Sequence, residues 1–198
     1  MLIAITGGIG AGKSVISRSL TVMGYEVYDC DSRAKEIIDN SEEIKSEISR
    51  RISSAVIDKD CRLDRRALAS IVFSDKNKLK ILNDITHGAV RQDIAEWTNK
   101  VRESGKVMFV ETAILYESGI DKMVDCVWEV TAPYEIRIGR VMSRDKTERG
   151  SVEKRIAMQS QQPVEPHQDV HIIINDGCQS VIGRLIGLLN NIEKITLK

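Results

Sequence analysis

The sequence predicts an α/β fold in which a parallel sheet is covered by helices on both faces. Short apolar runs alternate with longer amphipathic stretches, and a glycine-rich turn joins the first apolar run to the stretch that follows it. This alternation is typical of parallel sheets, because the crossover helices bury both faces of the sheet. Ligands of such sheets bind beyond the carboxyl ends of the strands. Functional residues are therefore expected in the loops at those ends.

Five apolar runs are predicted to form the strands of this sheet: 2–6, 26–28, 107–110, 124–130 and 172–174. The second strand is expected to lie beside the first. Predicted helices of the core follow the 3.6-residue periodicity of apolar side chains and cover 14–23, 32–39, 134–144, 152–161 and 181–195. A polar connection is expected over 145–152.

The segment from about 41 to 100 is almost entirely helical in its periodicity, which is more than a simple crossover needs. We interpret it as a helical lobe, about 41–103, inserted into a single domain that covers 1–198. The core of that domain would comprise about 1–40, 104–135 and 168–198. The remaining segment, about 136–160, carries several arginines and is interpreted as a short lid.

Composition excludes several classes of protein. The chain has 198 residues, and its 29 Lys and Arg balance its 29 Asp and Glu, so neither a nucleic-acid partner nor a membrane surface is indicated. No apolar stretch approaches the length of a membrane span. Four cysteines lie far apart without a CxxC pair, which is typical of a protein from a reducing cytoplasm: Cys30, Cys61, Cys126 and Cys178.

A phosphate-binding motif follows the first predicted strand. The stretch Gly7-Gly8-Ile9-Gly10-Ala11-Gly12-Lys13-Ser14 matches G-x-x-x-x-G-K-S/T and comes directly before a predicted helix. Glycines let backbone N–H groups turn toward a phosphate, and the helix N-terminus adds about half a positive charge. Lys13 is expected to reach the β- and γ-phosphates, and the Ser14 hydroxyl is expected to ligate Mg²⁺. The motif predicts a bound nucleoside triphosphate.

Other segments favour a small-molecule kinase among the classes that share this motif. The N-K-x-D guanine reader of switch GTPases is missing, and the strand 107–110 ends in Glu111-Thr112 rather than the Asp-Glu of mechanical ATPases. A kinase needs a base for the acceptor hydroxyl. Asp31 could supply it, or could cap the helix that follows it. Both interpretations stay open on spacing alone.

Arginines at i, i+3 and i+7 form a second candidate group on one helix face: Arg137, Arg140 and Arg144. Guanidinium groups suit the charge of a transferring phosphoryl group. A solvated helix face paired with carboxylates is the equally open alternative. Glu111 and Glu117 could each orient Mg²⁺ through water or simply close the end of the sheet. His87 is more often a cap or packed residue than a ligand in such a context.

Taken together, these motifs resemble the dephospho-CoA kinase family over nearly the whole chain. Thr6–Ser14 is close to the family's T-G-G-I-G-S-G-K-S, and Asp29-Cys30-Asp31 falls on its D-A-D. Further matches follow in the family's order: Leu63–Leu68, His87, Glu111–Glu117, Arg140 with Arg144-Asp145, Arg155, Gln159 and Asn175-Asp176-Gly177. The chain departs from the family at Arg137, where Gln is usual, and at Gly88, where Pro is usual.

The resemblance implies a P-loop nucleotide kinase fold and ATP-dependent phosphorylation of the ribose 3′-hydroxyl of dephospho-CoA. Asp31, Lys13 and Arg140 would be the catalytic residues, with Ser14 on Mg²⁺. ATP would contact Gly8, Ile9, Gly10, Ala11, Gly12, Lys13, Ser14, Val15, Arg144, Asn175 and Gly177. The acceptor would contact Asp31, Arg65, His87, Arg91, Glu111 and Leu115. Another P-loop kinase, such as a nucleoside monophosphate kinase, and a non-catalytic nucleotide-binding regulator remain alternatives. A cytoplasmic monomer or weak homo-oligomer is expected.

Overall fold

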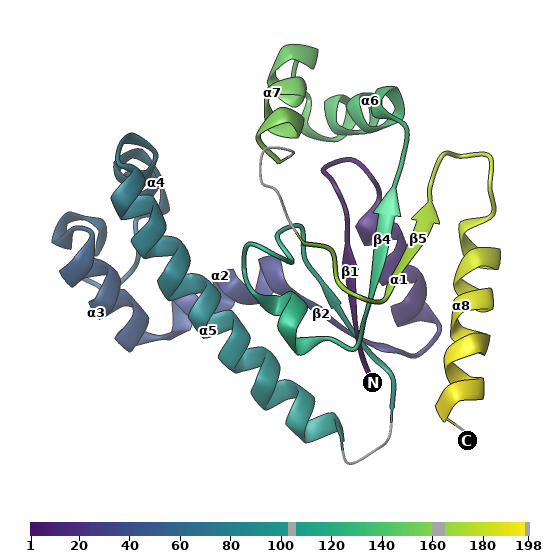
Figure 1. Cartoon of the computed structure of the whole chain (residues 1–198). Helices are drawn as coiled ribbons and strands as arrows, with labels where there is room; N and C mark the ends of the chain where they lie inside the picture. Colours follow the sequence, from purple (N-terminus) through teal and green to yellow (C-terminus); the bar gives the residue numbers. More distant parts are fainter. Residues whose placement is uncertain (103–105, 160–164, 197–198) are drawn as a thin grey trace. The chain divides into compact units, whose positions relative to one another are not determined.

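A computed structural model describes residues 1–102, 106–159 and 165–196 of the chain. Within these residues the chain forms two compact units, Met1–Tyr28 with Gly105–Lys198, and Asp29–Ser104. The first unit holds a five-stranded parallel sheet with the order β2-β3-β1-β4-β5 (Figure 1). Its strands are β1 (Leu2–Thr6), β2 (Glu26–Asp29), β3 (Met108–Glu111), β4 (Cys126–Thr131) and β5 (Val170–Ile174).

The sheet order corrects the expectation that the second strand lies beside the first. Strand β3 separates β2 from β1, and Ile3 pairs in register with Phe109 of β3 on one side and with Cys126 of β4 on the other. The burial of the strands explains this order. The β3 side chains Met108, Phe109 and Val110 are all buried, as a central strand requires, whereas β2 is short and partly exposed, which suits an edge.

Helices α1 (Lys13–Val22) and α8 (Val181–Thr196) pack on one face of the sheet. Alternate strand residues point to this face, because successive side chains of a strand project to opposite sides. Phe109 lies at the centre, with its ring 5.0 Å from that of Trp128 and 5.5 Å from that of Tyr25. The core that results joins Ile3, Ile5, Ala11, Ile16, Leu20, Phe109, Cys126, Trp128, Val130, Ile173, Leu185, Leu188, Leu189 and Ile192.

Two further helices follow β4 at its carboxyl end, α6 (Tyr134–Asp145) and α7 (Arg149–Gln159) (Figure 1). They pack against each other through buried Ile138, Val141, Val152 and Ile156, and the side chain of Ile9 from the glycine-rich loop packs on the same cluster. The segment expected as a lid is therefore anchored to that loop by apolar contacts. Its last expected residue, 160, lies outside the described residues.

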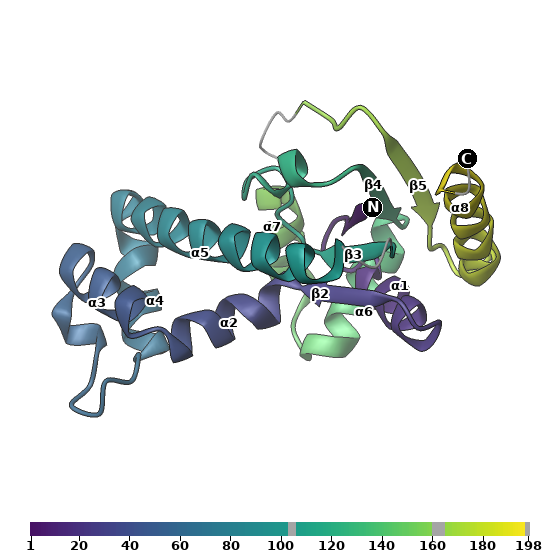
Figure 2. The ribbon, with the colours of Figure 1, turned by 90° about the horizontal axis from the view of Figure 1, so that it is seen from below.

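The second unit is helical and contains the expected lobe. It is built from α2 (Cys30–Asn40), α3 (Glu42–Arg51), α4 (Arg65–Ser74) and α5 (Lys76–Arg102), with a single turn, η1, at Ser54–Val56. Figure 2 shows α2 running beside the long α5, with α3 and α4 gathered around one end of α5. A second apolar core joins these helices, including Ile38, Ile48, Leu68, Val72 and Ile85. Helix α2 groups with this unit, whereas the sequence analysis assigns residues up to 40 to the core.

Several element boundaries differ from those expected, and β5 is among them, since it begins at Val170 rather than residue 172. Helix α2 begins at Cys30 rather than residue 32, because Asp29 caps it. Helix α7 begins at Arg149, so the connection after α6 is confined to 146–148. Strand β4 begins at Cys126 rather than residue 124, since the preceding segment contains the turn η2 (Ile120–Met123). The expected end of α7 at 161 lies outside the described residues.

All four cysteines are free thiols. Cys30 and Cys126 are buried, whereas Cys61 and Cys178 are exposed, one in the helical unit and one in the sheet unit. Among the described residues, every helix is too short or too polar to cross a membrane.

Candidate nucleotide-binding site

The glycine-rich loop between β1 and α1 has positive φ angles at three glycines, which are Gly7 (+143°), Gly10 and Gly12. Gly10 has φ +78° and Gly12, the N-cap of α1, has φ +99°. Both values lie in the left-handed region, which side chains other than glycine rarely adopt. A Cβ at Gly12 would also collide with Nδ2 of Asn175. The first amides of α1 have no partners within the helix, so this end of the helix is suited to bind an anion.

The backbone groups of this loop are held by partners from α1, α6, α7 and the loop itself. Lys13 Nζ donates to the Gly7 carbonyl at 2.9 Å, and the Ala11 amide donates to that of Gly8 at 3.1 Å. Arg137 Nε donates to the Ile9 carbonyl at 2.9 Å. The Ile9 amide in turn donates to Gln159 Oε1 at 2.8 Å. These bonds fix the direction of successive peptide planes, which is what a phosphate-binding loop requires.

Asn175, directly after β5, connects the loop to the far edge of the sheet. Its Nδ2 donates to the Ala11 carbonyl at 2.9 Å, and its Oδ1 accepts from Arg140 Nη2 at 3.2 Å. Its backbone amide donates to the Thr131 carbonyl at 2.8 Å. The side chain is buried, so each of these polar groups needs its partner. Gly177, two residues on, has φ +83° and completes the turn.

The arginines of α6 and α7 divide into two sets. Arg137 and Arg140 point to the loop, and Arg140 Nη1 lies 3.3 Å from the Ala11 carbonyl and 3.5 Å from that of Gly10. Arg144 pairs instead with Asp145 at 2.7 Å, which leaves it on the surface. Two more surface arginines follow the second pattern: Arg149, with Glu135 and Glu153, and Arg155, with Asp145. The solvated-face interpretation therefore applies to Arg144, whereas a contact of Arg137 or Arg140 with a phosphoryl group stays a prediction.

The contacts of these arginines also shift the pKa values of the ionisable groups beside the loop and on the surface of α6 and α7. Partial burial lowers the pKa of Arg137, although a guanidinium remains protonated at any physiological pH. The hydrogen bond from Arg144 lowers the pKa of Asp145, and that from Arg149 lowers the pKa of Glu135. The half-buried cations beside the loop therefore remain available to a polyphosphate, whereas the surface cations are compensated.

Ser14, the last residue of the motif, lies against Glu111 at the carboxyl end of β3. The Ser14 hydroxyl donates to Glu111 Oε1 at 3.3 Å. A hydroxyl and a carboxylate are hard oxygen donors of the kind that Mg²⁺ prefers. The residues present therefore fit a Mg²⁺ ion at this corner. The sequence analysis places Glu111 with the acceptor residues, whereas its contact in the structure is with the phosphate-binding loop.

In the helical unit, the structure decides which aspartate caps α2. Asp29 Oδ1 accepts from the amides of Asp31 and Ser32 at 3.0 and 3.2 Å, and its Oδ2 accepts from the Ser32 hydroxyl at 2.7 Å. Asp29 is therefore the N-cap. The Asp31 carboxylate is exposed, and it makes no hydrogen bond or ion pair with the residues that the structure describes. The interpretation of Asp31 as a helix cap is wrong.

The remaining acceptor residues of the sequence analysis are spread over several elements. Arg65, the first residue of α4, donates to the Asp39 carboxylate at 2.8 Å and to the Lys35 carbonyl at 3.2 Å. His87 and Arg91 are half-buried and lie one turn apart on α5. Leu115 belongs to the sheet unit, and only 1% of it is exposed. Val15, expected at the nucleotide, is about half exposed on α1.

Two residues that hold the loop, Gln159 and Arg137, are not among the catalytic and ATP-contacting residues that the resemblance implies. Gln159 accepts from the Ile9 amide and donates to the Ala113 carbonyl at 3.5 Å. Arg137 lies over Gly8, and a Cβ there would meet its guanidinium. The sequence contains a signal for each. Gln159 closes the R-x-x-x-Q pattern, and Arg137 begins the arginine series. Their contacts depend on how α6 and α7 pack, which spacing does not specify.

Parallel strands, a glycine-rich loop ending in Lys-Ser, and cations beside it define a P-loop small-molecule kinase. The family model for dephospho-CoA kinase matches residues 1–180, and the chain belongs to this family. A dephospho-CoA kinase of Fusobacterium nucleatum is 38% identical over 80% of this chain and 81% of its own length. One from Bacteroides fragilis is 33% identical over 94% and 90%.

Solved structures agree with this assignment. A protein from Thermus thermophilus superposes with a TM-score of 0.79 at 30% identity, over 96% of both chains. The dephospho-CoA kinase of Campylobacter jejuni gives a TM-score of 0.66 at 25% identity, over 98% of this chain and 96% of its own. The comparisons therefore establish the fold and the family, while the roles of individual residues rest on the contacts above.

We predict that Asn175→Ala raises the KM for ATP by about tenfold, because it removes the shorter of the two hydrogen bonds to the Ala11 carbonyl and leaves one Arg140 N–H unpaired. Leaving a buried polar group unpaired costs roughly 1–3 kcal/mol, part of which is recovered by water. Steady-state kinetics with varied ATP measure the change. The matched control is Asn190→Ala, since Asn190 is exposed on α8. Equal KM values for the two variants would contradict the role of Asn175 as a support of the loop.

Proposed function

We propose that this chain transfers the γ-phosphoryl group of ATP to the ribose 3′-hydroxyl of dephospho-CoA, giving CoA and ADP, the last step of coenzyme A biosynthesis. Membership of the dephospho-CoA kinase family carries this conclusion. The supported glycine-rich loop, with Lys13 at its end, is the physical basis for binding the triphosphate. Electrostatic stabilisation by backbone amides and cations accounts for most of the catalysis in such enzymes.

Acceptor specificity tests the reaction directly. ADP release is measured in a coupled assay with dephospho-CoA, AMP, CMP and UMP as acceptors at equal concentration. Dephospho-CoA is expected to support turnover at least about a hundredfold faster than the others, because a site built for a large acceptor gains binding energy that a mononucleotide lacks. Faster turnover with a mononucleotide would make the chain a nucleoside monophosphate kinase. No phosphoryl transfer in a single-turnover experiment would make it a binding protein.

In the proposed mechanism, Asp31 accepts the proton of the 3′-hydroxyl. The hydroxyl oxygen bonds to the γ-phosphorus as the bond from phosphorus to the bridging β–γ oxygen breaks, and ADP leaves with that oxygen. The free, exposed carboxylate of Asp31 supports this role, because a general base needs an oxygen that other donors do not already occupy. Asp29 lacks that freedom, since both of its carboxylate oxygens accept hydrogen bonds at the start of α2.

Matched variants of the two aspartates separate the base from the cap. Asp31→Asn is expected to lower kcat by roughly 10²–10⁴ with little change in ATP affinity, the range for loss of a positioned base. Asp29→Asn is expected to retain most of kcat, because Asn caps helices about as well as Asp. Turnover and ATP binding by calorimetry give both quantities. Equal losses of kcat in the two variants would contradict the assignment of Asp31.

Ser14 and Glu111 are the proposed protein groups toward Mg²⁺. When bound, Mg²⁺ neutralises charge on the β- and γ-phosphates. The Ser14 hydroxyl would ligate the ion directly, and Glu111 would orient a ligand or a bound water from the end of β3. The hydrogen bond between the two side chains supports their common role, since it holds both oxygens at one corner of the loop.

Glu111→Gln is expected to raise the Mg²⁺ concentration for half-maximal activity by roughly tenfold, because loss of an outer partner typically costs 10- to 100-fold in metal affinity. A magnesium titration at saturating ATP and acceptor measures it. Glu117→Gln is the matched comparison, since Glu117 is an exposed carboxylate six residues further along the chain. If Glu117→Gln shifts the titration and Glu111→Gln does not, the ligand assignment is wrong.

The helical unit is proposed to bind the acceptor through Arg65, His87 and Arg91, whose cationic or polar heads suit its phosphates and amides. Segment 140–150 is proposed to close over the nucleotide and keep water from competing with the hydroxyl. Arg140 would then stabilise the transferring charge, in addition to holding the loop. A cytoplasmic location and a monomeric or weakly oligomeric state stay predictions.

A further inference from the structure

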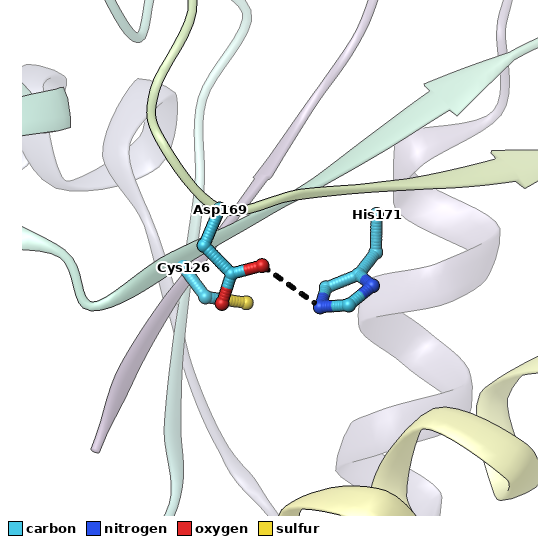
Figure 3. Close-up of side chains that lie close together, drawn as sticks. All are labelled: Cys126, Asp169 and His171. Atoms are coloured by element: carbon cyan, nitrogen blue, oxygen red, sulfur yellow. Dashed lines mark ion pairs between the residues drawn. The ribbon is translucent and has the colours of Figure 1, made fainter.

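Three potential metal ligands from different positions converge at the edge of the sheet, on β4 and β5 (Figure 3). Cys126 is the first residue of β4, Asp169 precedes β5 directly, and His171 is the second residue of β5. The Cys126 sulfur, one Asp169 oxygen and one His171 ring nitrogen all lie within 4.8 Å of one another. His171 Nε2 is 3.2 Å from Asp169 Oδ1.

The pairing of the two strands fixes this convergence. Val127 pairs in register with Val170, and the Val127 amide donates to the Asp169 carbonyl at 2.9 Å. Cys126 therefore lies opposite Asp169. His171 follows Asp169 by two residues, so its side chain projects from the same face of the sheet. The ligand atoms are held by backbone hydrogen bonds within a sheet, which is more rigid than a loop.

We propose that Cys126, Asp169 and His171 bind a transition-metal ion, for which Zn²⁺ is the best fit, with water in a fourth position. A sulfur, an imidazole nitrogen and a carboxylate oxygen form a donor set typical of Zn²⁺ and unsuited to Mg²⁺. Zinc–ligand bonds of about 2.0–2.3 Å place tetrahedral ligands roughly 3.3–3.7 Å apart. Since the ligand atoms lie within 4.8 Å of one another, the longest separation needs to contract by roughly 1.1–1.5 Å at most, within the reach of side-chain rotation.

Exposure and surroundings also suit an ion. The side chains of His171 and Asp169 are 41% and 54% exposed, so an ion and its water can enter, whereas Cys126 is buried beneath them. Within the part of the chain that the structure describes, the indole N–H of buried Trp128 makes no well-formed hydrogen bond, and it lowers the pKa of the neighbouring Cys126 thiol. That N–H is a ready donor to a metal-bound thiolate, the kind of outer contact that orients metal ligands.

The free thiol is protonated, since burial and then Asp169 raise the pKa of Cys126 to about 12. A bound cation cancels the charge of Asp169 and displaces the thiol proton to solvent, as binding to cysteine generally does. Asp169, whose negative charge disfavours the Cys126 thiolate in the metal-free protein, thus becomes a ligand of the bound ion.

The proposed metal site lies away from the phosphate-binding loop. Cys126 pairs in register with Ile3, near the amino end of β1, whereas the loop leaves the carboxyl end of that strand. An ion there would cross-link the edge strand β5 to β4 and stabilise the folded state. It would take no part in phosphoryl transfer.

The test is metal binding by the full-length chain in the presence of excess Mg²⁺, which keeps hard-oxygen sites occupied. Zn²⁺ titration by calorimetry should show one equivalent bound, and Co²⁺ should give tetrahedral d–d bands with a thiolate-to-cobalt charge-transfer band. His171→Ala should weaken Zn²⁺ affinity by roughly 100-fold or more, since even an outer-shell change costs 10- to 100-fold. Cys126→Ala should abolish the charge-transfer band.

A control variant, Cys178→Ser, should bind normally, because Cys178 is an exposed cysteine outside the proposed site. Wild-type protein without a bound equivalent of Zn²⁺ would overturn the proposal, as would unchanged binding in His171→Ala. The exposed position of His171 keeps the test decisive even if Cys126→Ala fails to fold. Bound metal should also raise the Tm of the wild-type chain, and this rise should vanish in His171→Ala.

Discussion

The structure of the sheet unit depends on how the carbonyl groups of one loop are satisfied. A loop that turns its amides toward a phosphate turns its carbonyls toward the protein, and each buried carbonyl needs a donor. Here the donors come from Lys13 on α1, Arg137 and Arg140 on α6, and Asn175 after β5. Helix α6 and the far edge of the sheet are therefore tied to the loop by the same bonds that shape it. A change in the position of α6 would be transmitted to the nucleotide site.

The need to satisfy these carbonyls also explains why two arginines lie beside the loop, although the N-terminus of α1 already supplies partial positive charge there. Arg137 and Arg140 each use part of a guanidinium to hold carbonyls. A guanidinium has five N–H donors in a fixed plane, so it can support the backbone with some and offer others to an anion. A glutamine at position 137 could support a carbonyl but would bring no charge. Arg137 therefore adds a positive charge beside Gly8.

Much of the fold and the centre of the site could be predicted from the sequence, and the physical reasons are local. The glycine-rich motif combines a strand, a turn and a helix N-terminus in eight consecutive residues, so spacing alone predicts it. The choice between Asp29 and Asp31 as the cap required the actual start of α2, which lies two residues earlier than periodicity suggested. The strand order could not be read from hydrophobic runs, because burial of β3 and exposure of β2 are properties of the assembled sheet. Similarly, Gln159 reaches Ile9 only through the packing of α7 on α6.

The distribution of the thiols has a practical consequence for spectroscopy. Cys30 and Cys126 are buried, while Cys61 and Cys178 are exposed on different compact units. The natural sequence therefore offers one accessible attachment point on each unit for maleimide dyes. A donor and an acceptor fluorophore at these two positions would report the separation of the units by energy transfer, without any engineered cysteine. Single molecules could then be followed while nucleotide and acceptor are added, and any change in the distance between the two labels would be measured directly.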